Sequence, residues 1–422
     1  MLDPEYLRNV AEGSEKIASD LHDYIIDRLV IRILRRIGKG KDYILSGTDR
    51  WSIETLQESG YLLEEITAEL AKRTKLQKKE IKASMEEAGV KALEYDHKVY
   101  TDAGLSPMPL EQSPGLIRLM ERNMLATLGE WDNFTRTTAE TAQRTYITAC
   151  DLAYNKVMTG STSYAQAVRE AVEMAIDSGA VIIYPTGHKD TLETATARAV
   201  RTGIAQATGD IALKRMEEMD WDIILVSAHV GARTGDGGQN PSNHLWWQGQ
   251  YYSRTGIDKR FPDFKESTGY GTGEGLCGWN CRHSFGSGTG RSEDNPYKEI
   301  NQADNYKAEQ AQKRQRLLER RIRSTKRAVM ALQDAVENTK DDAARFELQQ
   351  LLERKSYLLE RQSTAYSQYC KDNKLKPQNE RLQMAKWQRE QARKARTDAK
   401  LYKDAKGDKN DIKTISKKGN KE

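Results

Sequence analysis

Apolar residues recur about every 3.6 positions through the N-terminal third of the chain, which is the period of an amphipathic helix. The repeat is formed by Leu21, Ile25, Leu29, Ile33 and Leu34, and later by Leu62, Ile66, Leu70 and Leu76. Gly38 and Gly40 are placed to end the first long helix, and Thr48 or Asp49 is placed to cap the next one. We therefore expect successive helices over residues 4–130.

The middle of the chain mixes helical and strand patterns. After a segment with three prolines at 103–115, which cannot continue a helix, helical character returns over 116–175 and ends at Gly179. The β-branched runs in "VIIYPTGHKD" and "WDIILVSAH" predict strands, and the helix between them is expected to begin at a Thr191 cap. Helix and strand therefore share one domain.

Residues 231–296 contain fourteen glycines, several aromatic side chains and almost no periodicity. A long irregular segment of this kind is usually functional or held in place by specific contacts. Within it, "QGQYYS" and "DFKEST" are candidate short strands of a small sheet.

Beyond Asn301 the sequence returns to an almost uninterrupted helical pattern with a roughly seven-residue apolar spacing. A break at "ENTKDDA" favours two helices folded back as a hairpin over 301–376, and an extended coiled coil with a partner is the alternative. After Pro377 the chain is rich in Lys and Gln, and we expect residues 400–422 to be flexible or ordered only by contacts.

These patterns predict an α+β fold with a helix-rich N-terminal region, a small mixed core that carries the glycine-rich segment, and a long C-terminal helical hairpin. The four expected regions are 1–112 for the helical N-terminal part, to which the family resemblance described below assigns assembly contacts, 113–300 for the mixed core, 301–376 for the hairpin and 377–422 for a basic helical or flexible tail.

Composition adds a charge asymmetry to this outline. The 422 residues are 37% apolar and 31% charged, a balance that suits long exposed helices better than one large compact body. The net charge is +5, but residues 301–422 hold 31 Lys and Arg against 18 Asp and Glu, a local charge of +13. The basic end indicates either a polyanion partner, most simply double-stranded DNA, or a solvated helical surface.

Four cysteines in a chain of this length do not form a disulfide framework. The N-terminal stretch has no apolar core of a signal sequence, and no window holds eighteen consecutive apolar residues. We expect synthesis in a reducing cytoplasm and no membrane span.

The stretch "GEGLCGWNCRHSF" at 273–285 concentrates the chemistry of the chain. Cys277, Cys281 and His283 lie within seven residues, and His229 and His244 precede them in the same glycine-rich region. Thiolates and imidazoles are the ligands of structural zinc, so these five residues form a candidate zinc site. The alternative is that both cysteines are small buried groups in a tight turn.

Three other readings of this region remain open. Cys281 with His283 as base would be a nucleophile, although no orienting acid adjoins them. His229 and His244 with Asp236 and Asn240 are residue types of a metal-dependent nuclease, without a recognisable catalytic box. The aromatic and basic side chains either stack on nucleic-acid bases or form the core of a small subdomain; they are Arg233, Trp246, Trp247, Tyr251, Tyr252 and Arg254.

Several ordered motifs in residues 180–300 resemble those of the phage minor capsid protein type 2 family, which is related to the Mu F-like head morphogenesis proteins. The motifs are "ATARAVRTGIAQATG", "SAHVGAR", "WQGQYYS", "FPDF" and "TGYGTGEGLCGWNCRHSF". The matching positions are His229, Gly231, Ala232, Arg233, Trp247, Gly249, Gly271, Gly273, Gly275, Leu276, Cys277, Asn280, Cys281, Arg282 and His283. The run "TGDGGQNPSNHLW" is longer than the family's spacer, so the position of His244 departs from the family pattern.

The resemblance implies a non-enzymatic virion component with no catalytic residues, made in the host bacterial cytoplasm. It further implies a place at the portal vertex and capsid interior, with portal and major capsid proteins as partners, and a role in head assembly and in DNA packaging or delivery. A metal-dependent nuclease, a cysteine hydrolase and a DNA-binding module are the alternative functions.

Overall fold

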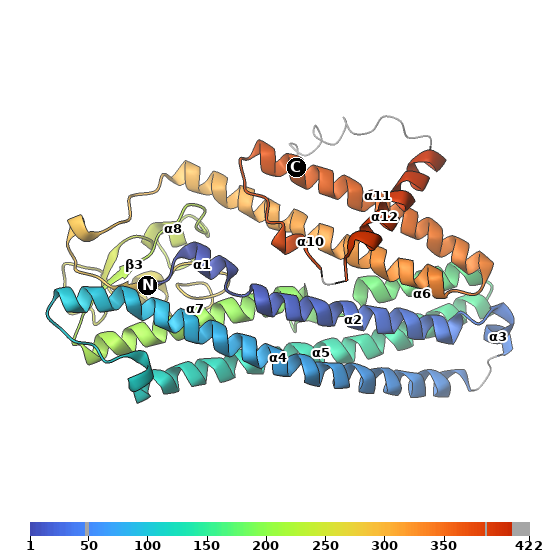
Figure 1. The fold of residues 1–422 in the computed structure, drawn as a ribbon, viewed down its shortest axis with the longest axis horizontal. Coiled ribbons are helices and arrows are strands. Elements are labelled where there is room, and N and C mark those ends of the chain that lie inside the picture. Colours follow the sequence, from blue (N-terminus) through green and yellow to red (C-terminus); the bar gives the residue numbers. More distant parts are fainter. Residues whose placement is uncertain (47–49, 385, 407–422) are drawn as a thin grey trace. The chain divides into compact units, whose positions relative to one another are not determined.

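The computed structural model describes residues 1–46, 50–384 and 386–406, and most of them are helical (Figure 1). The α-helices are α1 (Pro4–Asn9), α2 (Glu12–Ile37), α3 (Lys41–Ser46), α4 (Trp51–Asp102), α5 (Pro114–Met158), α6 (Tyr164–Ser178), α7 (Leu192–Glu218), α8 (His244–Trp247), α9 (Phe264–Thr268), α10 (Gln302–Asn338), α11 (Asp342–Asp372) and α12 (Arg389–Lys406). The strands are β1 (Val181–Ile183), β2 (Lys189–Thr191), β3 (Ile223–Val226), β4 (Tyr251–Ser253) and β5 (Phe285–Ser287). The broad α+β class is confirmed, with helices dominant.

The chain forms two compact units, and each is assembled from three separate segments. Unit 1 comprises Met1–Ser19, Glu69–Thr137 and Ile182–Lys313. Unit 2 comprises Asp20–Ala68, Thr138–Val181 and Arg314–Glu422. The four regions expected from the sequence are consecutive along the chain, and they stay a prediction. Thr48, Asp49 and most of the expected 400–422 tail lie outside the described residues.

Unit 1 contains a three-stranded antiparallel sheet with the order β4-β3-β5. Ile224 of β3 faces Tyr252 of β4 and Ser287 of β5 in the register of the sheet. Ile224 and Val226 are both buried and belong to the main hydrophobic cluster. The strand predicted in "WDIILVSAH" is therefore the centre of the sheet, because its β-branched side chains fill the core beneath it.

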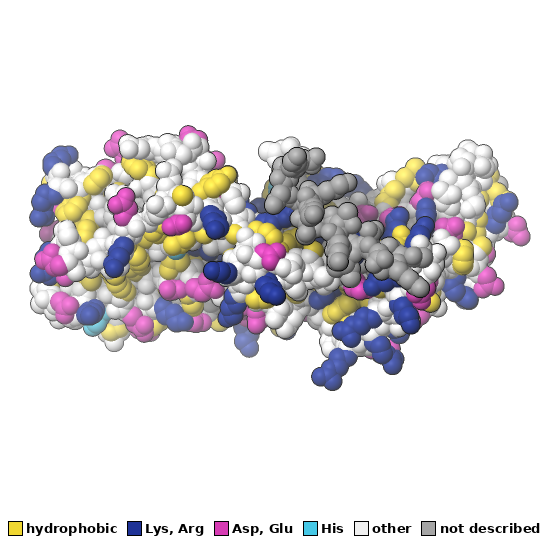
Figure 2. Space-filling model, turned by 90° about the horizontal axis from the view of Figure 1, so that it is seen from above, with side chains coloured by type: hydrophobic (Ala, Val, Ile, Leu, Met, Phe, Trp, Pro, Cys, Tyr) yellow, Lys and Arg dark blue, Asp and Glu magenta, His cyan; other side chains and the backbone are white. Residues whose placement is uncertain are grey.

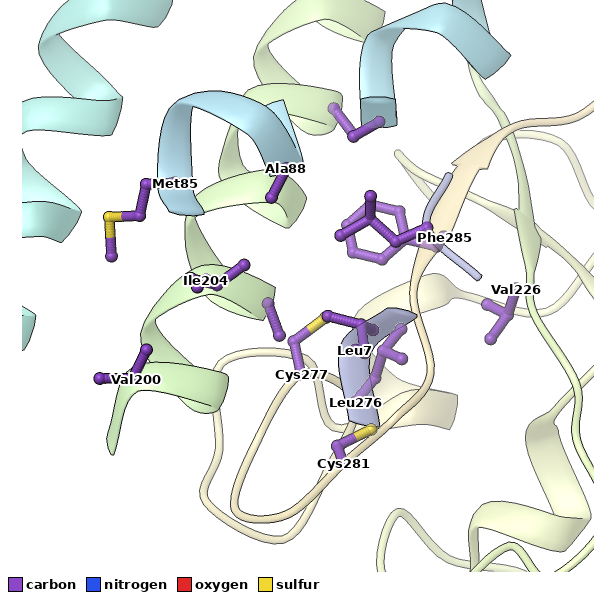
Figure 3. Packing of buried hydrophobic residues seen from close by; sticks show 14 of the residues in the cluster. Leu7, Met85, Ala88, Val200, Ile204, Val226, Leu276, Cys277, Cys281 and Phe285 are labelled. Carbon is purple, nitrogen blue, oxygen red and sulfur yellow. The ribbon is translucent and has the colours of Figure 1, made fainter. Parts of the chain in front are cut away.

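The core of unit 1 gathers side chains from helices, strands and the glycine-rich segment. Figure 3 shows Met85 and Ala88 of α4, Ile204 of α7 and Phe285 of β5 around Cys277 and Cys281. Gly203 allows α7 to approach α5 closely, because a Cβ atom there would lie 2.0 Å from the Thr127 Oγ1 atom. The irregular segment is thus packed against regular elements on its inner side.

Unit 2 is built from helices that pair through buried polar contacts. In α10 and α11 the Gln315 Nε2 atom lies 3.6 Å from the Cys370 Sγ atom, and the Tyr366 hydroxyl donates to the Glu319 carboxylate at 3.1 Å. The two contacts run in opposite directions along the helices, so this part of α10 and α11 is antiparallel. An antiparallel pair of consecutive helices is a hairpin, while the division of the chain at 301 and 376 stays a prediction.

Local sequence signals account for several element boundaries. The Thr191 side chain accepts a hydrogen bond from the Thr194 amide and caps α7, as predicted. The expected strand at "DFKEST" is wrong, because the segment forms the short helix α9. The Asp263 side chain accepts the Glu266 amide at 2.8 Å, and this N-cap favours a helical turn over an extended strand.

Candidate metal centre

The segment that carries both cysteines folds as a tight loop because glycine occupies its crowded positions. A Cβ atom at Gly275 would lie 2.2 Å from the Gly269 carbonyl oxygen, and one at Gly278 would lie 2.4 Å from that of Gly273. The Trp279 amide donates to the Gly273 carbonyl at 2.7 Å and closes the turn. Only glycine fits such close backbone approaches, which explains the composition of the motif.

Three of the five predicted ligands come together in the core of unit 1. The Cys281 Sγ atom lies 3.6 Å from the His283 Nδ1 atom and 3.8 Å from the His244 Nδ1 atom. One ligand atom from each of the three residues falls within 4.8 Å of the others, and all three residues are buried. His244 is the first residue of α8, whereas Cys281 and His283 lie on the extended stretch that leads into β5.

Gln248 fixes the tautomer of His283. Its Oε1 atom accepts the His229 backbone amide at 3.0 Å, so the amide oxygen must point into the site, and it lies 2.9 Å from the His283 Nε2 atom. An acceptor at that distance requires a proton on Nε2. The Nδ1 atom of His283 therefore presents a lone pair to the Cys281 sulfur.

His244 has support for both of its neutral tautomers. Its Nε2 atom lies 2.8 Å from the Glu274 carbonyl oxygen, which can accept a hydrogen bond, and 2.8 Å from the Arg233 guanidinium, which can donate one. The guanidinium also donates to the Glu274 carbonyl at 2.9 Å, so it keeps a partner in either case. The proton of His244 can therefore lie on Nε2 or on Nδ1 without movement of heavy atoms.

Burial keeps the histidines neutral. It lowers the pKa of His283 well below its usual value, and the nearby His229 and His244 lower it further. Burial and then the Arg233 charge lower the pKa of His244 to about 3. Neutral imidazoles are the form that binds a metal.

Burial also raises the pKa of the Cys281 thiol, while hydrogen bonds to the backbone of His283 and Cys277 and the charges of Arg233 and Arg282 oppose that rise. The pKa of Cys277 is raised well above its usual value, by burial first and then by Cys281. The two arginines favour the thiolate at Cys281, which is the cysteine that faces both imidazoles.

The other two predicted ligands occupy different positions. The Cys277 Sγ atom lies 3.8 Å from the His283 carbonyl oxygen, and its side chain belongs to the hydrophobic cluster (Figure 3). The His229 ring stacks on that of His283 with 4.4 Å between centroids, and its Nδ1 atom lies 3.1 Å from the Val230 carbonyl oxygen. The structure thus brings His244, Cys281 and His283 together and leaves these two outside the trio.

The residues of the alternative readings lie in other surroundings. Asp236 accepts the Asn240 side-chain amide at 2.7 Å and the Gly238 amide at 2.9 Å, which makes a local turn outside the ligand trio. Trp247 and Tyr252 are fully buried, so they form the private core of the subdomain and offer no face for stacking on a base.

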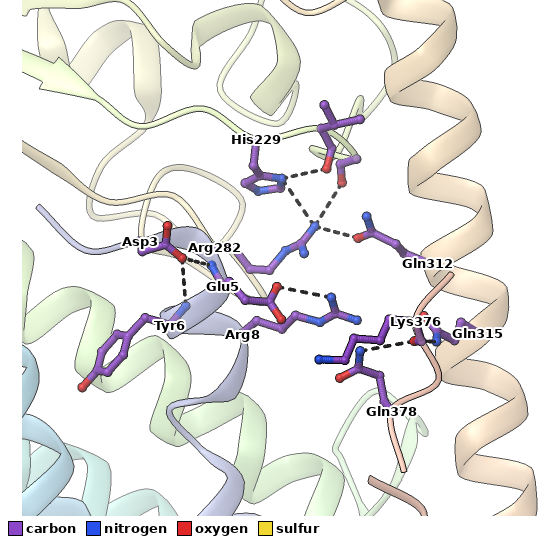
Figure 4. Close-up of polar contacts among 12 residues, drawn as sticks. Asp3, Glu5, Tyr6, Arg8, His229, Arg282, Gln312, Gln315, Lys376 and Gln378 are labelled. Atoms are coloured by element: carbon purple, nitrogen blue, oxygen red, sulfur yellow. Dashed lines mark hydrogen bonds and ion pairs between the residues drawn. The ribbon is translucent and has the colours of Figure 1, made fainter. Parts of the chain in front are cut away.

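Side chains at the start of helix α10 form hydrogen bonds with the glycine-rich segment. The half-buried Arg282 guanidinium donates to the Gln312 Oε1 atom at 2.9 Å (Figure 4) and to the Gly231 carbonyl at 3.3 Å. The Asn305 side chain accepts the Gly231 and Ala232 amides at 2.8 and 2.9 Å. The sequence gives no signal for the roles of Gln248, Asn305 and Gln312, because nothing in the local pattern marks a side-chain amide that forms a hydrogen bond across a long sequence separation.

Comparison with known proteins gives one match. The model of the family described as phage minor capsid protein 2 matches residues 2–359. The chain belongs to the phage minor capsid protein 2 family. No curated protein and no solved structure matches it.

In this minor capsid protein some of the positions that carried the resemblance contact the trio, since the Arg233 guanidinium and the Trp247 ring both adjoin His244. Gly231 has φ of +83°, which favours glycine, and Cys277 and Asn280 adopt φ of +60° and +57° in the loop. The family motif therefore encodes a folded irregular platform. None of the helices in the described ranges combines the length and the apolar character that a membrane-spanning helix needs.

Proposed function

We propose that this protein is a structural, non-enzymatic component of the phage head that lies at the portal vertex, contacts portal and major capsid proteins, and aids head assembly and DNA packaging or delivery. The observation that carries the proposal is the family match over residues 2–359, which includes both compact units in large part. A capsid protein works by binding its neighbours in the head, so its surfaces should offer sites for protein contact.

The start of α4 in unit 2 provides such a surface. Ile53, Leu56 and Tyr61 are each 58% exposed on this helix. Large apolar side chains that remain exposed are suited to burial against another protein. They support a docking role for this end of α4, with a portal subunit as the proposed partner.

The environment of Cys281 supports a structural role over a cysteine hydrolase. Its side chain is 2% exposed, and burial raises the pKa of its thiol. A nucleophilic cysteine needs both a thiolate and access for the substrate. The thiol of this protein is suited instead to holding its own loop.

Contact with packaged DNA is the finer part of the proposal, and α12 supports it. Arg389, Arg393, Arg396 and Lys400 are exposed and follow one another at intervals of four, three and four residues, so they share one face of the helix. Ala395 and Ala399 are buried on the same helix. On the face shown in Figure 2, Lys and Arg are interspersed with Asp and Glu. We expect the basic stripe on α12 to supply the contacts to phosphates.

Electron cryomicroscopy of purified virions, reconstructed without imposed symmetry, tests the location. We expect density that fits the helical units at the portal vertex, and its loss in particles assembled without this protein. Density distributed over the icosahedral shell, or particles that contain none of this polypeptide, would overturn the proposal.

A further inference from the structure

In the core of unit 1 the Cys281 sulfur atom lies close to two imidazole nitrogens, His283 Nδ1 and His244 Nδ1. A neutral thiol has one proton, so Cys281 can donate to only one of the two Nδ1 atoms. The Cys281 sulfur also accepts the His283 backbone amide at 3.4 Å. In the metal-free state the trio is satisfied only if His244 carries its proton on Nδ1 and donates it to the sulfur.

We propose that Cys281, His244 and His283 bind one zinc ion, through the sulfur and the two Nδ1 atoms, and that this ion pins the glycine-rich segment to the core. The proposal goes beyond the structural role in the head and does not depend on it. The three residues lie at the two ends of a segment of nearly forty positions. One ion would therefore connect α8 to the stretch that leads into β5.

The distances match a tetrahedral zinc site. With Zn–S of about 2.3 Å and Zn–N of about 2.0 Å, a tetrahedral angle places sulfur and nitrogen about 3.5 Å apart. The two observed separations are 3.6 and 3.8 Å. The two sulfur–nitrogen separations therefore suit the ion, and the three ligand atoms already lie within 4.8 Å of one another.

The two histidines also have the hydrogen-bond partners that ligating histidines have in known metal sites. A ligating histidine usually donates its other ring N–H to a carbonyl or carboxylate, which orients the ring and fixes the tautomer. Here the Gln248 Oε1 atom lies 2.9 Å from His283 Nε2, and the Glu274 carbonyl lies 2.8 Å from His244 Nε2. The two Nδ1 atoms would then both present lone pairs to the ion.

Binding balances with the loss of one proton. The Cys281 thiol releases its proton to solvent, and the proton of His244 moves from Nδ1 to Nε2, where it is donated in a hydrogen bond to the Glu274 carbonyl. The mixed nitrogen and sulfur set favours zinc over hard cations such as Mg²⁺ and Ca²⁺. Three protein ligands leave the fourth tetrahedral position to water or an added ligand.

Cys277 provides a matched control, because it is a second buried cysteine four residues away in the same hydrophobic cluster. Full-length wild type, Cys281→Ser and Cys277→Ser proteins should be purified and their metal measured by mass spectrometry, with circular dichroism as the check on folding. We expect about one tightly held zinc per chain in wild type and Cys277→Ser. We expect at least a tenfold lower content in Cys281→Ser.

X-ray absorption at the zinc edge of the wild-type protein keeps the test independent of variant folding. The expected first shell has one sulfur and otherwise nitrogen or oxygen. Two sulfurs, or loss of zinc from a folded Cys277→Ser protein, would overturn the ligand set. Wild-type protein that keeps no zinc after dialysis would overturn the site itself.

Discussion

The Nε2 atom of His283 lies 2.9 Å from the Oε1 atom of Gln248, and the same oxygen accepts the backbone amide of His229. The buried Gln248 side chain thus orients an imidazole of the proposed zinc site and connects that imidazole to the backbone of His229, which lies 19 residues before Gln248. Gln248 is a positioning residue in this arrangement, because its oxygen acts on the ion only through His283.

Replacement of Gln248 by Met should weaken zinc binding about 10- to 100-fold. This is the usual effect of removing the hydrogen-bond partner that orients a metal-ligating histidine. Gln250→Met is the matched control, since Gln250 is exposed and its amide donates to the Trp246 carbonyl. Zinc affinity would be measured by competition with a chromogenic chelator. Equal affinities for the two variants would show that Gln248 does not orient a ligand.

Arg282→Met should loosen the contact between the glycine-rich segment and α10. The substitution removes the donor to the Gly231 carbonyl and to the half-buried Gln312 side chain. Gly231 is buried, and a buried carbonyl left without its partner costs about 1–3 kcal/mol. Hydrogen exchange of the amides at 231–233 and 305–313 should become faster. Arg291→Met, at an arginine with a side chain that is 66% exposed, should leave exchange there unchanged.

The sequence predicted what local interactions decide. The α7 cap at Thr191 and the central strand from "WDIILVSAH" depend on neighbouring residues, and both are confirmed. The "DFKEST" segment forms a helix instead of the expected strand, because the Asp263 side chain caps its first turn.

The contacts around the candidate centre depend on residues far apart in the sequence, so periodicity carried no signal for them. Asn305 holds the Gly231 amide across 74 positions, and Arg282 reaches Gln312 across 30. The ligand residue types could be named from the sequence, but only the fold shows that His244 faces Cys281 while Cys277 lies apart from the trio.

Asp23 and Arg327 form a buried ion pair in unit 2, with 2.5 Å between the carboxylate and the guanidinium and both side chains at most 5% exposed. Asp23→Ala should cost about 3–5 kcal/mol, because it removes the close counter-charge of a buried guanidinium. The loss should appear as faster hydrogen exchange in α2 and α10 around the two positions.

Two further variants decide whether burial causes that cost. Asp342→Ala breaks an Asp–Arg pair whose side chains are 94% and 45% exposed, and it should cost no more than about 1 kcal/mol. The double variant Asp23→Leu with Arg327→Met should recover much of the loss, since apolar residues of similar size can replace a buried pair. An Asp23→Ala effect as small as that of Asp342→Ala would contradict the explanation.

Neutralising the basic stripe of α12 should weaken binding to duplex DNA and reduce its salt dependence. Each phosphate contact contributes about 0.9 to the slope of log affinity against log salt, so the triple change Arg393→Gln, Arg396→Gln and Lys400→Gln should lower the slope by up to about 2.7. Fluorescence anisotropy of the full-length protein with a labelled duplex across a salt series measures this slope.

The matched control changes three lysines of α4 to Gln. They are Lys75, Lys78 and Lys82, which are exposed at comparable spacing. An equal loss in the control would mean that net charge, rather than α12, determines binding, and no binding by the wild type at low salt would remove the DNA contact from the proposed function.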